Sequence, residues 1–456
     1  MARDTLDATP VCSRDDLVGW LEQGNKPQAA FRIGTEHEKI PFTLSRHEPV
    51  PYEGPSGIRA VLDGMRAING WDPILEGDYI IGLSDPIGGG AISLEPGGQF
   101  ELSGAPLASI HETCAEINSH LAQLRQVADP LGLGFLGLGM SPKWSRAETP
   151  VMPKGRYRIM AGYMPKVGRL GLDMMFRTCT VQVNLDFSSE ADMVRKLRVS
   201  LALQPLATAL FANSPFTEGR PNGFLSFRSE IWRDTDADRS GMLPFAFEDG
   251  MGFERYVDYA LDVPMYFVKR GDTYLDVSGS SFRALLAGRH PALPGETATL
   301  SDWVNHLSTI FPEVRLKRYL EMRGADAGPW STLCALPALW VGLLYDGAAL
   351  DAAMDLIRSW STEELQRVRD EVPRLGLRTM IAGRSLREVA GEVLAIARAG
   401  LTRRRALDSQ GRDETRFLAP LEETEASGLV PAERLLERYF GPWGQTIEPV
   451  FKELAY

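Results

Sequence analysis

Pairs of acidic side chains recur at a spacing of two in segments that are predicted as strands. The first pair, Glu36 and Glu38, lies in "FRIGTEHEKIPF", residues 31–42. Side chains alternate across a strand, so both carboxylates point to the same side at a separation of about 7 Å, where like charges repel. That face is therefore either solvated or in contact with something positive. His37 points to the opposite side, which favours a structural role for its ring.

A second acidic pair lies in "AISLEPGGQFEL", residues 91–102. Pro96-Gly97-Gly98 predicts a hairpin turn that places Glu95 opposite Gln99 and Ser93 opposite Glu101. The four polar side chains then share one face of the hairpin. The alternative is a hairpin with one solvated side, which is common in antiparallel sheets.

Two further strands combine one apolar face with one polar face. The segment "RTCTVQVNLDF", residues 177–187, presents Gln182 and Asn184, and "LKRYLEMRGAD", residues 316–326, presents Tyr319, Glu321 and Arg323. No lysine occupies these polar positions. Carboxylates without lysine partners suit hard divalent cations, and Mg²⁺ takes carboxylates together with substrate phosphates. Four such faces together favour metal binding over four solvated surfaces.

Basic residues gather in two segments rich in glycine or aromatic residues. Residues 152–169 contain Lys154, Arg156, Arg158, Lys166 and Arg169, and residues 226–241 contain Arg228, Arg233 and Arg239. Arginine can bind a carboxylate or phosphate through two parallel hydrogen bonds. For most of these residues taken singly, the alternative is ordinary surface charge.

The elements that must position these residues follow from apolar spacing. Spacings of three and four predict helices, and alternation predicts strands at 31–42, 131–140, 177–187 and 316–326. The predicted helices are 15–25, 56–69, 106–128, 190–212, 331–345, 350–358, 361–372 and 385–399. Strands separated by helices predict an α+β fold with a mainly antiparallel sheet. No linker or repeat is visible, so we expect a single catalytic domain, 1–456, with a helical C-terminal part from about residue 346.

Composition excludes several classes of protein. The chain of 456 residues is 44% hydrophobic and 24% charged, with a net charge of −11, which argues against nucleic-acid or membrane-surface binding. There is no run of 18 apolar residues and no apolar signal core at the N-terminus. Four cysteines are too few for a secreted disulfide framework. We therefore expect a cytoplasmic monomer or homodimer whose partners are small molecules.

Several long strings resemble the glutamate–cysteine ligases of the plant and proteobacterial type. They include "GTEHEK", "SLEPGGQFELSG", "TCAEINSHL", "RDTDADRSGMLPF", "YLEMRGAD" and all of residues 152–190. The resemblance runs from about residue 30 to about residue 345 and is weaker beyond. It implies a glutamine-synthetase-like carboxylate–amine ligase fold, with a curved, mainly antiparallel sheet and helices on its apolar face. It also implies that ATP, L-glutamate and L-cysteine form γ-glutamylcysteine through a γ-glutamyl phosphate, the first step of glutathione biosynthesis.

The resemblance assigns roles to individual residues. It implies Mg²⁺ ligands around the ATP phosphates, namely Glu36, Glu38, Glu95, Glu101 and Glu321. Gln182 and Asn184 would line the same cavity. Arg156 and Arg228 would bind the glutamate substrate. Arg323 would lie beside the transferring phosphoryl group, so that Arg323 and Glu321 are the catalytic residues.

The resemblance also concerns the cysteines. It implies a disulfide between Cys114 and Cys334 that links activity to redox state, whereas the alternative is two buried free thiols. Val277 and Ala292 stand where the plant enzymes carry the cysteines of a hairpin disulfide, so that bridge is not expected. A plastid transit segment is also not recognised, which agrees with a bacterial cytosolic enzyme.

Three alternatives remain open. A ligase of the same fold could join glutamate to another amine. A non-catalytic protein could use the same face to bind a divalent cation or another ligand. A glycosidase would need two acids at a defined spacing across a sugar cleft, rather than five on one sheet.

Overall fold

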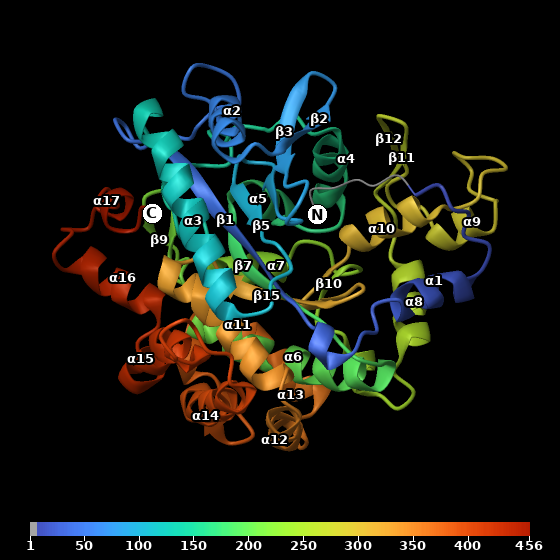
Figure 1. Cartoon of the computed structure of the whole chain (residues 1–456). Helices are drawn as coiled ribbons and strands as arrows, with labels where there is room; N and C mark the ends of the chain where they lie inside the picture. The colour runs from blue at the N-terminus through green and yellow to red at the C-terminus, as the bar shows by residue number, and fades with distance from the viewer. Residues whose placement is uncertain (1–6) are drawn as a thin grey trace.

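The computed structural model describes residues 7–456, which build a mixed structure around one large sheet. Within these residues, nine strands form this sheet in the order β14-β15-β7-β1-β5-β4-β3-β2, with β6 paired to β1 (Figure 1). Every strand pair in it is antiparallel. The strands are β1 (Ile33–Thr43), β2 (Asp72–Glu76), β3 (Tyr79–Ser84), β4 (Ala91–Leu94), β5 (Phe100–Ser103), β6 (Leu133–Leu136), β7 (Thr180–Leu185), β14 (Val314–Leu316) and β15 (Leu320–Asp326). The expected α+β fold with a mainly antiparallel sheet is confirmed.

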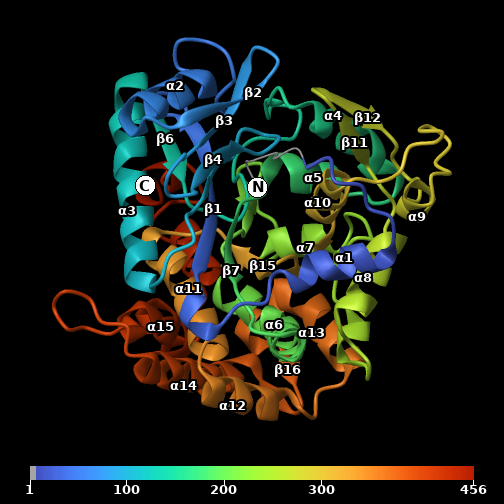
Figure 2. The same cartoon turned by 45° about the vertical axis from the view of Figure 1, so that its right-hand side comes forward.

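Helices cover the apolar face of the sheet. The long helices α3 (Ile110–Ala128), α6 (Glu190–Leu210) and α11 (Trp330–Leu344) pack there (Figure 2). Val181, Val183 and Leu185 of β7 alternate toward these helices and are completely buried. Burying this face leaves Gln182 and Asn184 on the opposite side, as the alternation predicts.

Smaller elements complete the fold. Short two-stranded pairs are formed by β8 (Phe216–Thr217) with β9 (Arg220–Pro221), β10 (Ser240–Gly241) with β13 (Phe311–Pro312), β11 (Phe267–Arg270) with β12 (Thr273–Asp276), and β16 (Met380–Ile381) with β17 (Arg384–Ser385). The remaining helices before residue 330 are α1 (Arg14–Glu22), α2 (Ile58–Asn69), α4 (Gly155–Tyr163), α5 (Gly171–Arg177), α7 (Phe227–Trp232), α8 (Phe253–Asp262), α9 (Phe282–Leu286) and α10 (Leu300–Ser308).

Side-chain caps set where the long helices begin. The Ser109 hydroxyl accepts from the backbone N–H of Glu112, and Ser189 does the same for Asp192. Each cap pairs a donor that the first helical turn leaves without a partner. Helix α3 therefore begins at Ile110 rather than at the predicted residue 106.

The predicted strand 316–326 is in fact a hairpin. Leu316 at the end of β14 pairs with Leu320 at the start of β15, and Lys317, Arg318 and Tyr319 form the turn. The Lys317 backbone N–H donates to the Tyr319 carbonyl at 2.8 Å, which closes this turn. Tyr319 is therefore not part of the polar strand face on which it was predicted.

The C-terminal part is helical, as expected from about residue 346. It contains α12 (Gly347–Ile357), α13 (Thr362–Leu375), α14 (Leu386–Arg404), α15 (Ala419–Ser427), α16 (Pro431–Phe440) and α17 (Val450–Glu453). Their apolar residues join the same core as α3, α6 and α11. One domain over 1–456 stays a prediction, which this shared core supports.

Two contacts attach this helical part to the rest of the fold. Helices α11 and α14 approach through Gly342 and Gly400, where a Cβ on Gly400 would lie 1.9 Å from the Gly342 carbonyl oxygen. The final residues bind the sheet: the Tyr456 N–H donates to the Phe135 carbonyl at 3.0 Å, and Ala455 bridges to Leu136.

The described chain, residues 7–456, contains no single helix long and apolar enough to cross a membrane. Helices α11 and α12 reach that length and apolarity only as a pair, and they are bent by 89° where they meet.

Candidate active site

The polar face of the sheet brings the predicted residues together through strand register. Glu36 on β1 lies opposite Gln182 on β7, and Glu38 lies opposite Glu101 on β5. On the hairpin, Ser93 lies opposite Glu101 and the Glu95 N–H donates to the Gln99 carbonyl at 3.0 Å, as predicted. Two carboxylates directly opposite each other destabilise a sheet unless a positive charge lies between them.

A cavity opens on this polar face. Of the residues assigned to the site, eight line it: Glu36, Glu38, Glu95, Glu101, Arg156, Gln182, Arg228 and Arg323. Asn184 and Glu321 are not among the lining residues. Residues that lay outside the assigned set also line it, including Ser93, Lys154, Thr180, Trp232, Phe311 and Arg315.

One end of the cavity holds a carboxylate cluster, defined here as Glu38, Glu95 and Glu101. Burial, and then the neighbouring Glu95 and Glu101 carboxylates, raise the pKa of Glu38 well above its ordinary value. Burial and the Glu101 charge likewise raise the pKa of Glu95 to about 7. Glu101 accepts hydrogen bonds from the hydroxyls of Ser93 at 2.7 Å and Ser103 at 2.8 Å. The cluster therefore favours the arrival of a cation.

The carboxylate cluster is not a complete metal site. Between residues 7 and 456, no three His, Cys, Asp or Glu side chains are placed to hold a metal ion by themselves. A Mg²⁺ ion bound here would take its remaining ligands from phosphates and water, which is its usual preference.

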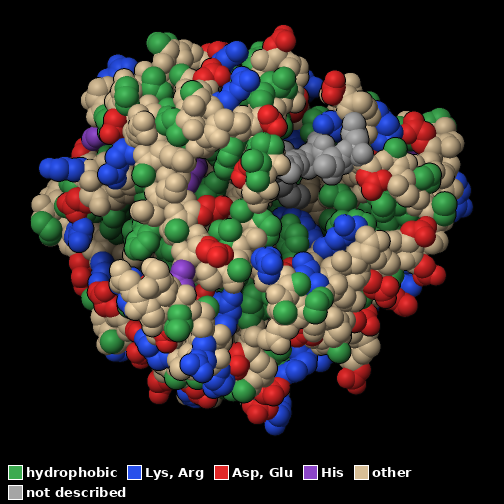
Figure 3. Space-filling model, viewed as in Figure 1, with side chains coloured by type: hydrophobic (Ala, Val, Ile, Leu, Met, Phe, Trp, Pro, Cys, Tyr) green, Lys and Arg blue, Asp and Glu red, His purple; other side chains and the backbone are tan. Residues whose placement is uncertain are grey.

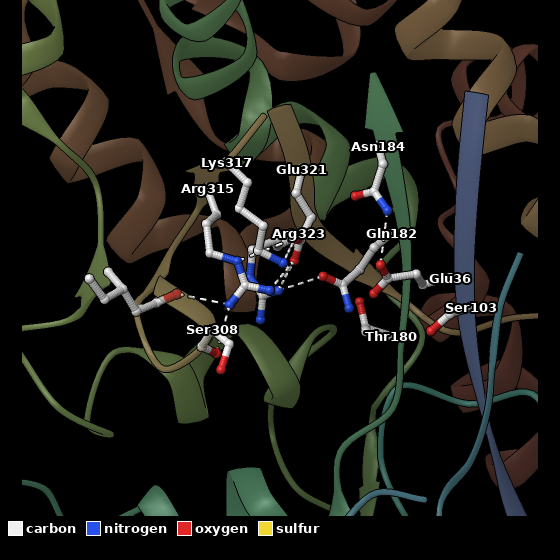
Figure 4. Close-up of polar contacts among 12 residues, drawn as sticks. Glu36, Ser103, Thr180, Gln182, Asn184, Ser308, Arg315, Lys317, Glu321 and Arg323 are labelled. Atoms are coloured by element: carbon white, nitrogen blue, oxygen red, sulfur yellow. Dashed lines mark hydrogen bonds and ion pairs between the residues drawn. The ribbon is translucent and has the colours of Figure 1, made fainter. Parts of the chain in front are cut away.

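At the other end of the cavity, Arg315 and Arg323 are lining residues. Together with Lys317, which does not line the cavity, they are defined here as the cationic cluster (Figure 4). All three contact Glu321, which is completely buried. Although burial alone raises its pKa, the three cations hold the pKa of Glu321 well below the ordinary value. Burial and the neighbouring Arg315 lower the pKa of Lys317 to about 8.

Two amides connect the strands between these clusters. The Asn184 side-chain amide donates to Glu36 at 2.9 Å, and Gln182 accepts from Arg323 at 2.6 Å (Figure 4). Asn184 thus orients Glu36 from outside the cavity, while Gln182 orients Arg323 from within it.

Basic side chains from α4 and α7 line the cavity beside the carboxylate cluster. Arg228 is buried, and its Nη2 donates to the Arg323 carbonyl at 3.0 Å. The Nε of Arg156 is buried and has no hydrogen-bond partner in the part of the chain that the structure describes. An unpaired buried donor is costly, so this position favours an anionic ligand. Lys154 donates to the Leu94 carbonyl at 2.9 Å beside them.

The other basic residues of the two segments have structural contacts or lie at the surface. Arg158 is exposed. Arg169 binds Asp234 at 2.5 Å, Arg233 binds Asp370 at 2.9 Å, and Arg239 binds Asp236 at 2.6 Å. Surface charge is mixed on the face in Figure 3, where blue and red side chains alternate without one large area of a single sign.

The idea that the acidic faces lack lysine partners was wrong. Lys317 binds Glu321 at 3.0 Å, and Lys154 lowers the pKa of Glu95 against the larger effect of burial. Lys154 comes from a loop outside the predicted strands, whereas Lys317 lies two residues before Tyr319 in the predicted strand 316–326 and was overlooked on that face. Arg315 could have been predicted from the sequence, because the polar residues recur at every second position from Arg315 to Arg323.

The two candidate cysteines are close together. Cys114 on α3 and Cys334 on α11 are both buried free thiols in this structure. Burial and the Cys334 thiol raise the pKa of Cys114. Val277 is buried at its position in the structure, at the end of the β11–β12 hairpin.

Comparison with known sequences gives a consistent result over nearly the whole chain. The family model described as Glutamate-cysteine ligase family 2 matches residues 32–453. The chloroplastic glutamate–cysteine ligase of Arabidopsis thaliana is 59% identical over 453 residues, covering 99% of this chain and 85% of that protein. The Medicago truncatula protein of the same name is 58% identical, covering 99% and 87%.

These relatives correct one prediction. They are named as chloroplastic, as is glutamate–cysteine ligase B of Oryza sativa subsp. japonica, which is 56% identical. The prediction of a cytoplasmic protein was therefore wrong, because it rested on finding no signal or transit segment and on the low cysteine content, neither of which identifies a compartment.

Solved structures support the fold. The glutamate–cysteine ligase of Francisella tularensis in complex with AMP aligns over 93% of this chain and 89% of that chain, with a TM-score of 0.54 at 12% identity. A bifunctional glutathione synthetase from Pasteurella multocida aligns over 97% of this chain and 52% of that chain, with a TM-score of 0.50 at 14% identity. The expected glutamine-synthetase-like carboxylate–amine ligase fold is confirmed.

Proposed function

The chain belongs to glutamate-cysteine ligase family 2, and from this membership we propose that it joins the γ-carboxyl group of L-glutamate to the amino group of L-cysteine. The reaction consumes ATP, proceeds through a γ-glutamyl phosphate and is the first step of glutathione biosynthesis. The observation that carries the proposal is a cavity on the polar face of the antiparallel sheet that is lined by both the carboxylate cluster and arginines.

Mg²⁺ is the proposed metal, bound with ATP by the carboxylate cluster. The raised pKa values of Glu38 and Glu95 support this, because a divalent cation would relieve the repulsion between buried carboxylates. Glu36 lies on the same strand face and lines the cavity next to them. When bound, Mg²⁺ neutralises phosphate charge and orients the phosphates.

The substrate carboxylates are assigned to Arg156 and Arg228. Both line the cavity beside the carboxylate cluster, and the buried Nε of Arg156 lacks a partner within residues 7–456. A guanidinium matches a carboxylate through two parallel hydrogen bonds. Arg323 lines the cavity at the other end, where its guanidinium is suited to the charge that develops on a transferring phosphoryl group.

The reaction requires no covalent attachment to the protein. The glutamate γ-carboxylate attacks the γ-phosphorus of ATP and ADP leaves, which forms the acyl phosphate. The cysteine amine then attacks the acyl carbon, phosphate leaves with the bonding electron pair, and the amine loses a proton. The protein contributes positioning and charge stabilisation to both displacements.

An ADP-release assay tests the proposal. Turnover is expected only when glutamate, cysteine, ATP and Mg²⁺ are all present, and γ-glutamylcysteine should accumulate in equal amount with ADP. Glu101→Gln should lower kcat by orders of magnitude while the fold is retained. Turnover in excess chelator, or full activity of Glu101→Gln, would contradict the metal assignment.

A panel of amines tests the substrate. If another amine gives a higher kcat/KM than cysteine, the chain is a ligase of the same fold with a different acceptor. If ATP is not hydrolysed with any amine, a ligand-binding role replaces the proposed activity.

A further inference from the structure

The carboxylate of Glu321 has no free lone pair in this structure. An ionised carboxylate offers about four acceptor positions on its two oxygens. Oε1 accepts from Arg315 Nη2 at 2.6 Å and from Arg323 Nη1, and Oε2 accepts from Arg315 Nε at 3.3 Å and from Lys317 Nζ at 3.0 Å. Four donors on four positions leave none for a metal ion.

Further hydrogen bonds hold the cations around Glu321 in place, as Arg315 shows. Arg315 Nη1 donates to the carbonyls of Ser308 at 3.1 Å and Ile310 at 3.0 Å, which fixes the guanidinium between α10 and β14 (Figure 4). Arg315 is itself buried. A metal ion at Glu321 would displace at least one buried guanidinium from partners that it could not replace nearby.

Arg323 is held on three sides. Its Nη1 contacts both Glu321 and Gln182, and its guanidinium lies 5.9 Å from the Trp232 ring centre and 5.7 Å from that of Phe311. The aromatic rings attract the cation through their faces and limit its movement. The group therefore enters the cavity in a defined orientation.

We propose that Glu321 is not a metal ligand but a positioning residue that gathers Arg315, Lys317 and Arg323 into a preorganised cationic cluster. This inference rests on the proposed function and assigns its phosphate site. The charge balance supports it, because two carboxylates, Glu321 and the nearby Glu36, face three cations and still leave excess positive charge at this end of the cavity. The side chains of the cationic cluster provide the positive charge that a divalent ion bound to Glu321 would otherwise provide. They bind the phosphate oxygens of the nucleotide.

The proposal divides the acids of the cavity into two kinds. The carboxylate cluster accepts from neutral donors instead: Glu101 accepts from the hydroxyls of Ser93 and Ser103, and Glu38 accepts from the Thr180 N–H at 2.9 Å. The charge of Glu321 is already paired with the side chains of Arg315, Lys317 and Arg323. Glu38 and Glu321 each lie in an acidic strand pattern, but under this proposal Glu38 binds Mg²⁺ and Glu321 does not.

Counting bound Mn²⁺, which replaces Mg²⁺ and is visible by electron paramagnetic resonance, tests this directly. The count is made on the full chain with a non-hydrolysable ATP analogue and glutamate. We expect Glu321→Gln to bind the same number of Mn²⁺ ions as the wild type, and to show a KM for ATP at least tenfold higher. Glu38→Gln is the matched control and should bind at least one ion fewer. Loss of one Mn²⁺ ion from folded Glu321→Gln would overturn the proposal.

Lys317→Met keeps the test decisive if Glu321→Gln does not fold. Under the proposal, the KM for ATP rises and the Mn²⁺ count is unchanged. If folded Lys317→Met leaves the KM for ATP unchanged, the cationic cluster does not act on the nucleotide and the proposal is wrong. The wild-type ligase assay is run in parallel: lack of γ-glutamylcysteine formation refutes the proposed function, whereas the Mn²⁺ count alone decides the role of Glu321.

Discussion

At the residue scale, Arg228 is the most direct test of glutamate binding. It is buried beside the carboxylate cluster, lines the cavity, and donates one hydrogen bond to the Arg323 carbonyl. Arg228→Ala should raise the KM for glutamate roughly ten- to a hundred-fold, because a hydrogen bond between charged groups contributes about 1.5–3 kcal/mol. Arg228→Lys should restore binding only in part, since lysine lacks the planar fork.

The control for Arg228 is Arg158→Ala on α4, which removes an exposed arginine. Its KM values should not change. Steady-state kinetics with each substrate varied in turn make the comparison. A rise in the KM for ATP alone in Arg228→Ala would assign the residue to the nucleotide instead.

Glu116 on α3 gives a prediction about stability and pH. Its Oε1 accepts from the Ala105 N–H at 2.8 Å, its buried Oε2 has no partner within residues 7–456, and burial raises its pKa to about 7. In the unfolded chain it ionises near pH 4.5. Between pH 4.5 and about 7 the folded state therefore binds more protons, so stability falls as pH rises through this range and the cost is complete above it.

Removing the Glu116 charge should remove that cost. Glu116→Gln should be more stable than the wild type above pH 7, by at most about 3 kcal/mol, and equally stable near pH 4. Urea unfolding at pH 5, 6, 7 and 8 measures the difference. A constant difference across these pH values would show that ionisation of Glu116 is not its cause.

The sequence identifies some residues of the site more readily than others. Glu36, Glu38, Glu95 and Glu101 follow from strand alternation and a short hairpin, both of which depend on neighbours in the sequence. The position of Lys154 depends on where its loop folds back. The contact of Arg315 with Glu321 depends on how β14 turns back to pair with β15. Alternation also cannot tell whether a polar side chain reaches the cavity, as with Asn184, or is already saturated, as with Glu321.

At the element scale, the contact between α11 and α14 depends on two glycines. A Cβ on Gly400 would lie 1.9 Å from the Gly342 carbonyl oxygen, and one on Gly342 would lie 2.5 Å from the Ala397 carbonyl oxygen. Gly400→Ala should destabilise the protein by about 1–3 kcal/mol, because the helices must separate.

Gly391→Ala, on the same helix α14, is the matched control. A Cβ there meets only the Glu425 side chain at 3.4 Å, an ordinary contact. The substitution should be neutral or stabilise the helix by up to about 1 kcal/mol. Chemical denaturation of the two variants checks this, and equal effects would refute the role of the close approach.

The disulfide hypothesis concerns the contact between α3 and α11, which contain Cys114 and Cys334. Cys114 and Cys334 are buried free thiols that lie close enough for Cys334 to raise the pKa of Cys114, so mild oxidation should join them and release two electrons and two protons to the oxidant. Closing so long a loop contributes up to about 5 kcal/mol in the chain-entropy model. We expect the oxidised protein to lose activity, at least partly, on reduction with dithiothreitol, while Cys114→Ser responds less.

Non-reducing peptide mapping checks the pairing. A 114–334 cross-linked peptide should form, with the exposed Cys12 and the buried Cys179 remaining free. Absence of that peptide, or an equal response of wild type and Cys114→Ser to reductant, would exclude the switch.

Elements were predicted well where the pattern is local. The alternation of β7 and the apolar spacing of α3 and α6 gave their positions to within a few residues. The segment 316–326 was misjudged because its alternating pattern continues through a turn, and pattern alone does not show where a strand reverses. The small pairs such as β10 with β13 join distant residues and carry no local signal.

At the scale of the whole molecule, the end of the chain supports the beginning of the sheet. Tyr456 donates through its N–H to the Phe135 carbonyl and through its hydroxyl to the Gly328 carbonyl, and Leu454 accepts from the Gly137 N–H. Deleting residues 454–456 should destabilise the protein by about 2–4 kcal/mol, at roughly 1 kcal/mol for each lost hydrogen bond plus lost burial.

Two point variants refine this deletion. Tyr456→Phe should cost about 1 kcal/mol through the hydroxyl alone, and Lys452→Ala, at an exposed position, should have no effect. Denaturant midpoints measure all three. If the deletion is as stable as the wild type, the chain end does not support the sheet.

The order of strands in the sheet has a consequence for how the protein is made. Strands β1, β7 and β15 are neighbours in the sheet but begin at residues 33, 180 and 320. At a synthesis rate of about 5–20 residues per second, β15 leaves the ribosome roughly 15–60 s after β1. During that interval β1 and β7 have an unpaired edge, and non-local pairing of this kind is intrinsically slow. Newly made chains should therefore depend on chaperones until residue 326 has emerged, because only then can the acidic and cationic ends of the cavity meet.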